Sequence, residues 1–311
     1  YRVDTTKHVD HETLVQFKAE LAKANPKFKL IGEIFDHDAK IDSYLNNGQM
    51  DSALDFGFND IAYDFVNGNL DGAELALEAR NAALSNVGTK GQFLSSHDED
   101  GFLKVALNGN VGKMMLAAAL QITAKGQPVI YYGEEIGTSG LNNWPMYDNR
   151  PDFDWSKAND ENPMFVHYKK LLTIRADYSK VFAKGDRNKV AGGNSDGYMV
   201  FDRTYNHVSI YVGLNTSVEE KQAIIQTPYV AGTKVTDIYN ETMYTVDTNG
   251  KLTVTIPSIA DGGTAILVAD PVDLVVAMIA QLPTEITMAN KPSVVATREA
   301  YNRLSEEQQL L

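Results

Sequence analysis

Short apolar runs that end in an acidic residue recur along the first third of the chain. Three of them end in Asp4, Glu33 and Asp98. A run of this kind is typical of a buried parallel strand, whose carboxyl end is where barrel enzymes hold their chemistry. A single acidic residue in such a place is usually a helix N-cap or a solvated loop end. Three of them at successive strand ends can converge on one cavity.

Apolar runs and helical periods alternate through the first 177 residues. The predicted strands are 1–4, 28–32, 52–56, 92–96 and 129–132. The predicted helices occupy 37–45, 72–84, 111–122 and 162–177, and an earlier one begins after the cap Asp10 and ends before Asn25. Strands that alternate with helices indicate a parallel sheet. A closed eight-stranded barrel would need three further strands upstream of Tyr1.

The period of the pattern changes near residue 178. Beyond it, apolar residues alternate with other residues, as at Val208, Ile210, Val212 and Leu214 and again at Leu252, Val254 and Ile256. This alternation is typical of half-buried antiparallel strands, and Asp-Gly and Asn-Gly pairs mark turns between them. The pattern divides the chain into an α/β part at 1–178, an all-β sandwich at 179–270, and a small helical module or linker at 271–311.

Composition narrows the classes of partner. The 311 residues carry a net charge of −13, which argues against nucleic acid or an anionic membrane but would not repel a neutral polysaccharide. The absence of cysteine excludes disulfides and thiolate zinc sites, and it is compatible with secretion from a Gram-positive cell. No apolar run approaches the roughly 20 residues of a membrane span. The sequence starts without Met or a signal peptide, so we expect a fragment of a longer chain.

Several short motifs follow one another in a recognisable order. Arg2-x-Asp4 is followed by Lys7-His8, then by Gly-Glu at 32–33 and by His-Asp at 97–98. Over residues 1–270 this order resembles the α-amylase superfamily of glycoside hydrolases, and it is most similar to the α-amylase half of bacterial amylopullulanases. The resemblance implies the C-terminal part of a (β/α)8 TIM barrel, followed by an antiparallel β-domain.

The resemblance also implies roles for the motif residues. Asp4 matches the nucleophile, Glu33 the general acid/base, and Asp98 the third carboxylate, which grips sugar hydroxyls. Arg2 lies two residues before Asp4, on the same face of the strand, so its guanidinium can keep Asp4 ionised. His97 would donate a hydrogen bond to the same sugar.

Other matching positions are expected to bind substrate or metal. Lys7 and His8 match residues that contact glucose units on the leaving-group side, and in many family members the carbonyl at the position of His8 binds Ca2+. Asp148 and Arg150 match contacts to more distant sugars, although a solvated loop explains them equally well. The segment 133–137 resembles a family signature that is mainly structural.

Aromatic residues are concentrated in the same loop as Asp148, namely Trp144, Tyr147, Phe153 and Trp155. Such rings can stack on sugar faces or simply anchor a long loop.

These expectations describe a retaining hydrolase that cleaves α-1,4 bonds of starch-like α-glucans through a covalent glycosyl-enzyme. Pullulanase-type α-1,6 debranching and α-glucan transglycosylation use the same carboxylates and stay open. A non-catalytic carbohydrate-binding protein is the alternative from another class, and the presence of all three carboxylates argues against it. We expect a secreted or cell-surface enzyme of a Gram-positive bacterium. Its partners would be an α-glucan polysaccharide or oligosaccharide and the missing N-terminal half of the barrel.

Overall fold

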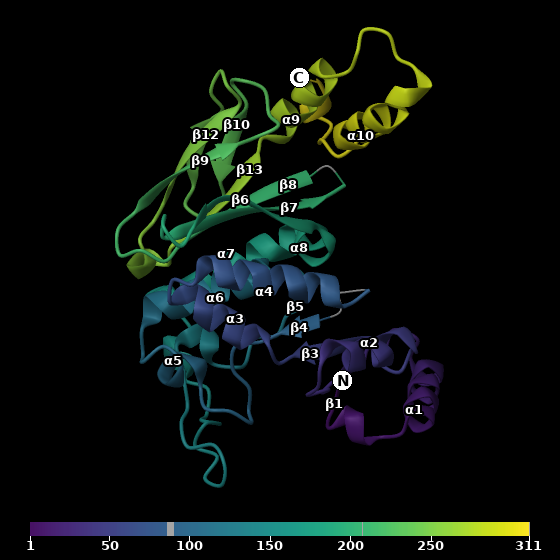
Figure 1. Ribbon diagram of the computed structural model, residues 1–311, viewed down its shortest axis with the longest axis vertical. Coiled ribbons are helices and arrows are strands. Elements are labelled where there is room, and N and C mark those ends of the chain that lie inside the picture. Colours follow the sequence, from purple (N-terminus) through teal and green to yellow (C-terminus); the bar gives the residue numbers. More distant parts are fainter. Residues whose placement is uncertain (86–89, 207, 311) are drawn as a thin grey trace. The chain divides into compact units, whose positions relative to one another are not determined.

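The computed structural model describes residues 1–85, 90–206 and 208–310 (Figure 1). The chain divides into two compact units. The first unit comprises Tyr1–Leu172 and Phe182–Lys184, and the second comprises Thr173–Val181 and Gly185–Leu311. In the described part of the chain, no helix is both long enough and apolar enough to cross a membrane.

The first unit contains a parallel sheet of five strands in sequential order, four of which overlap the predicted strands. The strands are β1 Arg2–Val3, β2 Ile31–Gly32, β3 Ser52–Asp55, β4 Lys90–Gln92 and β5 Gln127–Pro128. Each pairs in parallel with the next, so all carboxyl ends lie at one edge of the sheet. Among the described strands, β1 and β5 end the sheet on its two sides.

Two of these strands end earlier than the apolar pattern predicts. Gln92 closes β4, and Phe93 and Leu94 continue as buried chain outside the ladder. The predicted strand 129–132 is wrong, because β5 ends at Pro128, although the amide of Val129 still donates to the carbonyl of Gln92 at 2.8 Å. An apolar run reports burial rather than backbone pairing, and both segments stay buried or half-buried after pairing has stopped.

Helices follow the strands and cover the sheet. The helices that lie wholly or partly in the first unit are α1 His11–Ala24, α2 Asp38–Asn46, α3 Phe58–Val66, α4 Leu70–Ala83, α5 Phe102–Val105, α6 Val111–Thr123, α7 Pro163–Asp177 and α8 Ser179–Lys184. The side chain of Asp10 caps α1 by accepting from the amide of Thr13, as the sequence predicts. The sequence analysis missed α3, which packs against α4 and α6 through Phe58, Ala62 and Phe65.

The second unit is built from antiparallel strands (Figure 1). They are β6 Asp186–Gly193, β7 Tyr198–Tyr205, β8 Val208–Asn215, β9 Lys221–Gln226, β10 Lys234–Asp237, β11 Thr242–Thr245, β12 Lys251–Ile256 and β13 Thr264–Ala269. Six of them form a sheet in the order β11-β10-β13-β8-β7-β6, and β9 pairs with β12. Residues of both sheets, such as Leu267 and Val254, share one apolar core.

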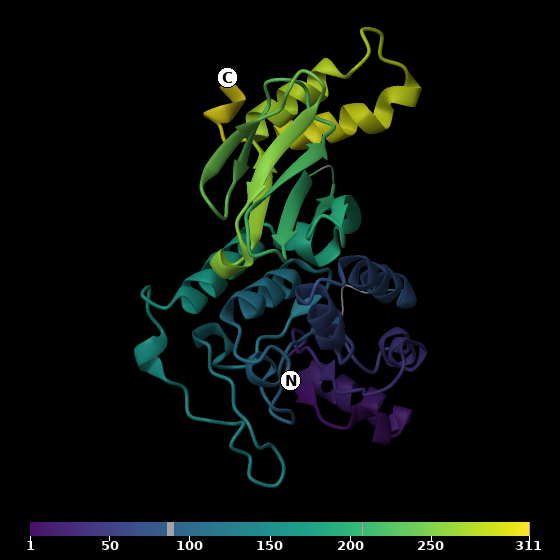
Figure 2. The same ribbon diagram turned by 60° about the vertical axis from the view of Figure 1, so that its left-hand side comes forward.

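The last segment forms the two predicted helices, α9 Pro271–Ala280 and α10 Lys291–Tyr301, which pack against each other (Figure 2). Asp270 caps α9 by accepting from the amides of Val272 and Asp273. Leu274 of α9 packs on the apolar core of the second unit. Short 3-10 helices complete the described chain at Thr6–His8, Glu134–Ile136, Trp155–Lys157, Ile259–Asp261, Met288–Asn290 and Gln308–Leu310.

Candidate active site

The carboxyl ends of β1 and β2 place two acidic side chains next to each other. Val3 pairs with Gly32, so the residues that follow them, Asp4 and Glu33, leave the sheet at the same edge. The amide of Glu33 donates to the carbonyl of Val3 at 3.0 Å, which fixes this register beyond the last ladder pair. Parallel topology therefore brings together two carboxylates that are distant in sequence.

Arg2 joins these carboxylates to a third. Its Nη1 lies 2.8 Å from Asp4 Oδ1, and its Nη2 lies 2.7 Å from Glu33 Oε1. The same Nη2 lies 3.8 Å from Asp98 Oδ2. A planar guanidinium presents several donors in a fixed geometry, which suits contact with more than one carboxylate. The structure thus gathers Asp4, Glu33 and Asp98 around one cation.

The three carboxylates differ in their surroundings. The Asp4 side chain is 69% exposed, whereas that of Glu33 is only 17% exposed. Glu33 Oε2 accepts from the amide of Thr5 at 2.9 Å, so both of its oxygens have partners. One side of the exposed Asp4 carboxylate is accessible to a ligand. The Glu33 carboxylate is largely buried and is held by Arg2 and by the amide of Thr5.

Asp98 is surrounded by polar groups from its own turn and from a distant loop. Its Oδ2 lies 3.1 Å from Nε2 of His97, and its Oδ1 lies 3.3 Å from Nη2 of Arg150. Of the predicted substrate-binding residues, Arg2, His97 and Arg150 therefore join the carboxylate cluster.

The loop that carries Arg150 is tied to the backbone of the Asp98 turn. The buried side chain of Asn149 donates from Nδ2 to the carbonyl of His97 at 3.0 Å and to that of Glu99 at 2.8 Å. Arg150 Nε adds a bond of 2.8 Å to the carbonyl of His97. We call these two residues the Asn149–Arg150 clamp, since together they bind both neighbours of Asp98. The sequence analysis missed Asn149, whose only signal was its position beside Arg150.

Lys7, His8 and Asp148 do not join the cluster. Lys7 Nζ donates to the carbonyl of Phe35 at 2.5 Å, and His8 is exposed in the 3-10 helix that follows Asp4. Asp148 is exposed and accepts from Asn142 within its own loop at 3.4 Å. Their expected contacts with sugar stay predictions.

The aromatic residues of the 141–155 loop contact one another in pairs, Trp144 with Tyr147 and Phe153 with Trp155. The guanidinium of Arg150 lies 4.3 Å from the centre of the Tyr147 ring. Both tryptophans are largely exposed, so their faces are accessible.

A cavity of about 170 Å³ opens beside the cluster. It is lined by Arg2, Glu33, Leu54, Phe56, Phe93, Ser95, Ser96, His97, Asp98, Glu99, Val129, Ile130 and Tyr131. Burial, and after it the neighbouring Tyr132, raises the pKa of Tyr131 to about 12, so its hydroxyl keeps its proton at neutral pH. Burial and the charge of Asp98 also raise the pKa of Glu99. Both apolar and charged side chains line the cavity, as is common in ligand sites.

A further buried carboxyl group, that of Glu134, contacts residues that line the cavity. Glu134, in the 133–137 segment, is 2% exposed, and burial raises its pKa to about 8. It accepts from the amide of Tyr131 at 3.3 Å and from Ser95, both of which line the cavity. These contacts agree with a mainly structural role for the segment.

The residues around His8 do not by themselves make a calcium site. In the described ranges there is no group of three or more His, Cys, Asp or Glu side chains that could hold a metal ion. Such a group does not include main-chain carbonyl ligands, so Ca2+ at the carbonyl of His8 stays a prediction.

Comparison with known proteins identifies the family. The family model described as "Alpha amylase, catalytic domain" matches residues 2–223. Neopullulanase 2 of Thermoactinomyces vulgaris is 29% identical over 237 residues, which are 75% of this chain and 39% of that protein. An amylopullulanase of Thermoanaerobacter thermohydrosulfuricus is 26% identical over 308 residues, covering 87% of this chain and 20% of that protein. The chain thus spans less than half of each of these relatives.

Solved structures show the same fold. The α-amylase of Geobacillus thermoleovorans superposes with a TM-score of 0.75 at 21% identity, over 87% of this chain and 59% of that one. An Anoxybacillus α-amylase gives a TM-score of 0.73 at 24% identity, over 86% of this chain and 58% of that one. The resemblance drawn from the motifs is confirmed, and the chain belongs to the α-amylase catalytic-domain family.

Proposed function

We propose that this chain forms the second half of the catalytic barrel of a retaining glycoside hydrolase, which cleaves α-1,4 bonds in starch-like α-glucans. The observation that carries the proposal is the contact of one guanidinium, Arg2, with three carboxylates at strand ends. The names of the relatives, which include neopullulanase, cyclomaltodextrinase and amylopullulanase, support an α-glucan as substrate.

In this mechanism Asp4 is the nucleophile. A carboxylate oxygen of Asp4 forms a bond to the anomeric carbon while the bond from that carbon to the leaving-group oxygen breaks. The contact with Nη1 of Arg2 at 2.8 Å orients one oxygen of the Asp4 carboxylate. The high exposure of Asp4 leaves its other oxygen accessible to the sugar.

Glu33 is the general acid and then the general base. It gives a proton to the leaving oxygen in the first step and takes one from water in the second. In the structure both Glu33 oxygens accept, from Arg2 and from the Thr5 amide. For Glu33 to carry a proton, one of its oxygens must give up its present partner. Oε1 is the candidate, because Arg2 can leave it and keep its contact with Asp4 through Nη1.

Asp98 grips sugar hydroxyls and favours the distorted ring of the transition state. The Asn149–Arg150 clamp holds its turn, and His97 and Arg150 flank its two oxygens. Preorganised polar groups of this kind stabilise charge that develops in the transition state.

The test uses the full-length enzyme that contains this chain. We expect Asp4→Asn to lower kcat on starch by several orders of magnitude while starch still binds, because the amide cannot form the intermediate. Asp160→Asn is the matched control, since Asp160 is exposed, pairs with Lys169 on the surface and lies outside the cluster, and it should retain most activity. Turnover of Asp4→Asn close to that of the unmodified enzyme would remove Asp4 from this role.

A second specificity is favoured by the pullulanase-type names among the relatives. An α-1,6 debranching reaction would use the same carboxylates. Parallel assays of reducing-sugar release from starch and pullulan separate the two specificities, and product analysis for longer glucans detects transglycosylation.

A further inference from the structure

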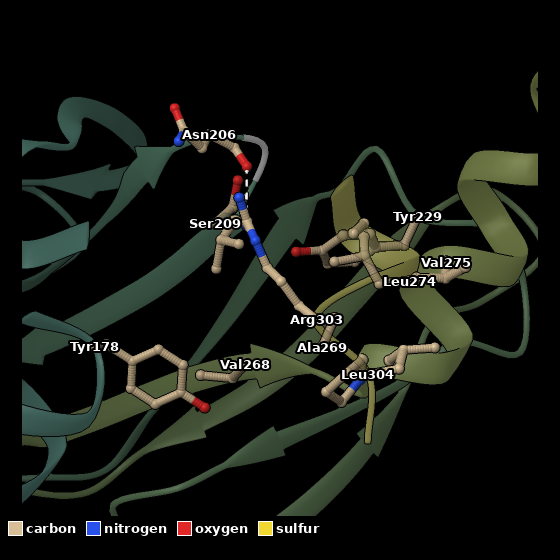
Figure 3. A pocket seen from close by; sticks show the side chains of 13 residues that line it. Tyr178, Asn206, Ser209, Tyr229, Val268, Ala269, Leu274, Val275, Arg303 and Leu304 are labelled. Carbon is tan, nitrogen blue, oxygen red and sulfur yellow. Dashed lines mark hydrogen bonds between the residues drawn. The ribbon is translucent and has the colours of Figure 1, made fainter. Parts of the chain in front are cut away.

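The second unit contains a cavity that the proposed reaction does not use. It has a volume of about 210 Å³ and lies where α9 and the end of α10 meet β8 and β13 (Figure 3). Its wall is mainly aliphatic, and includes Val268 of β13, Leu274 and Val275 of α9, and Leu304 just after α10. A cavity of about 150 Å³ lined by such side chains can hold a benzene molecule, so this one has room for a slightly larger ligand.

Polar side chains also line this apolar space. The side chain of Arg303 extends across the opening toward Asn206 and Ser209, and its Nη1 donates to the carbonyl of Asn206 at 3.3 Å (Figure 3). The hydroxyl group of Tyr178 points toward the cavity (Figure 3), whereas that of Tyr229 is hydrogen-bonded to Tyr211. Tyr178 is half-buried, and among the described residues its hydroxyl has no hydrogen-bond partner.

Arg303 has donors to spare. Apart from the bond to Asn206, its guanidinium is close to Glu299, whose Oε2 lies 3.9 Å from Nη2 with both side chains about half exposed. An exposed pair at this distance contributes little, so the guanidinium can exchange it for a better acceptor. A planar guanidinium suits a carboxylate, which can accept two parallel hydrogen bonds from it.

A neighbouring hollow indicates how a ligand would be oriented in the cavity. A more polar hollow of about 520 Å³ shares Tyr178, Asn206 and Arg303 with it and is also lined by Asp177 and Lys180. The guanidinium therefore lies where an apolar interior meets a polar, solvent-open space. An amphipathic ligand would place its apolar body inside and its charged group at Arg303.

We propose that this cavity binds a small monocarboxylate with an apolar body of about six carbon atoms. The aliphatic wall excludes water and favours a hydrocarbon body, and Arg303 recognises the carboxylate. A sugar would leave most of its hydroxyls facing aliphatic side chains, where they lose hydrogen bonds to water. The site is independent of the carboxylate cluster of the first unit.

The test is isothermal titration of the full-length enzyme with hexanoate, with 1-hexanol and with maltose. We expect hexanoate to bind with a Kd of about 1 mM or tighter, as suits so small a ligand. Arg303→Gln should weaken hexanoate binding at least tenfold and change hexanol binding less than threefold. Arg298→Gln, on α10 shortly before Arg303 but outside the cavity, is the matched control and should change neither.

A second variant keeps the charge and removes the space. Ala300 lines the cavity from the last turn of α10, so Ala300→Leu should abolish binding of both hexanoate and hexanol while starch hydrolysis is unchanged. Absence of hexanoate binding to the unmodified enzyme would overturn the proposal. So would hexanoate binding that is insensitive to both variants, or maltose binding that they weaken.

Discussion

Asn149 offers the sharpest test of how the site is held together. Its Nδ2 donates to the carbonyls on both sides of Asp98, at 3.0 and 2.8 Å, and the residue is only 2% exposed. In Asn149→Ala the carbonyl of His97 keeps its bond from Arg150 Nε, but the Glu99 carbonyl loses its bond from Asn149. Leaving a buried acceptor unpaired costs about 1–3 kcal/mol, and because this bond is only partly buried the free energy of unfolding should fall by about 1 kcal/mol.

The loss should also reach the chemistry, because the turn that carries Asp98 becomes free to move. A displacement of about 1 Å in a catalytic group can lower the rate about 100-fold. We expect kcat of the full-length Asn149→Ala enzyme on starch to fall about 10- to 100-fold, with KM changed less than threefold, since in the proposed mechanism Asp98 acts mainly in the transition state.

The assay measures initial rates at a temperature where denaturation curves show both proteins fully folded. Asn142→Ala is the matched control, because Asn142 lies in the same loop, is exposed, and makes a 3.4 Å bond to Asp148. A variant that loses stability but keeps its kcat would refute the reasoning: Asn149 would then stabilise the loop without positioning Asp98.

The remaining predictions address the acid, the buried carboxyl and the barrel. Glu33→Gln should abolish hydrolysis of starch yet retain part of the activity on a glycoside with an activated leaving group, which needs no proton; equal losses on both substrates would exclude the acid role. Because the pKa of Glu134 rises from 4.5 to about 8 on folding, its contribution to stability is complete below pH 4.5 and is lost as the pH rises toward 8. Urea denaturation should show this loss, up to about 1.4 kcal/mol per pH unit, and Glu134→Gln should lack it; parallel pH profiles would contradict it. The 311-residue chain alone should be inactive and should aggregate or self-associate, since β1 and β5 end the described sheet and unpaired edges promote association; light scattering that shows an active monomer would disprove this.

The strand order and the convergence of Asp4, Glu33 and Asp98 could be predicted because both depend on local patterns and on parallel topology. The predicted strand positions were wrong where apolar residues continue beyond the last paired residue, as at Phe93 and Val129. The cavity beside α9 could not be predicted either. It depends on how a helix pair packs on strands from elsewhere in the chain, and the pattern predicts only which faces are apolar.

Arg2 and Asn149 show where the limit of sequence reasoning lies in this site. Arg2 could be predicted because it stands two residues before Asp4 on one strand, and period-two geometry places both side chains on the same face. Asn149 acts across 52 residues, through an amide that donates to main-chain carbonyls, and any residue type presents the same carbonyl to it. A side chain that recognises backbone leaves no complementary residue type at its partner position. Contacts of this kind can therefore be recognised only once the fold is known. Here they hold the turn that carries Asp98 as directly as the charged residues do.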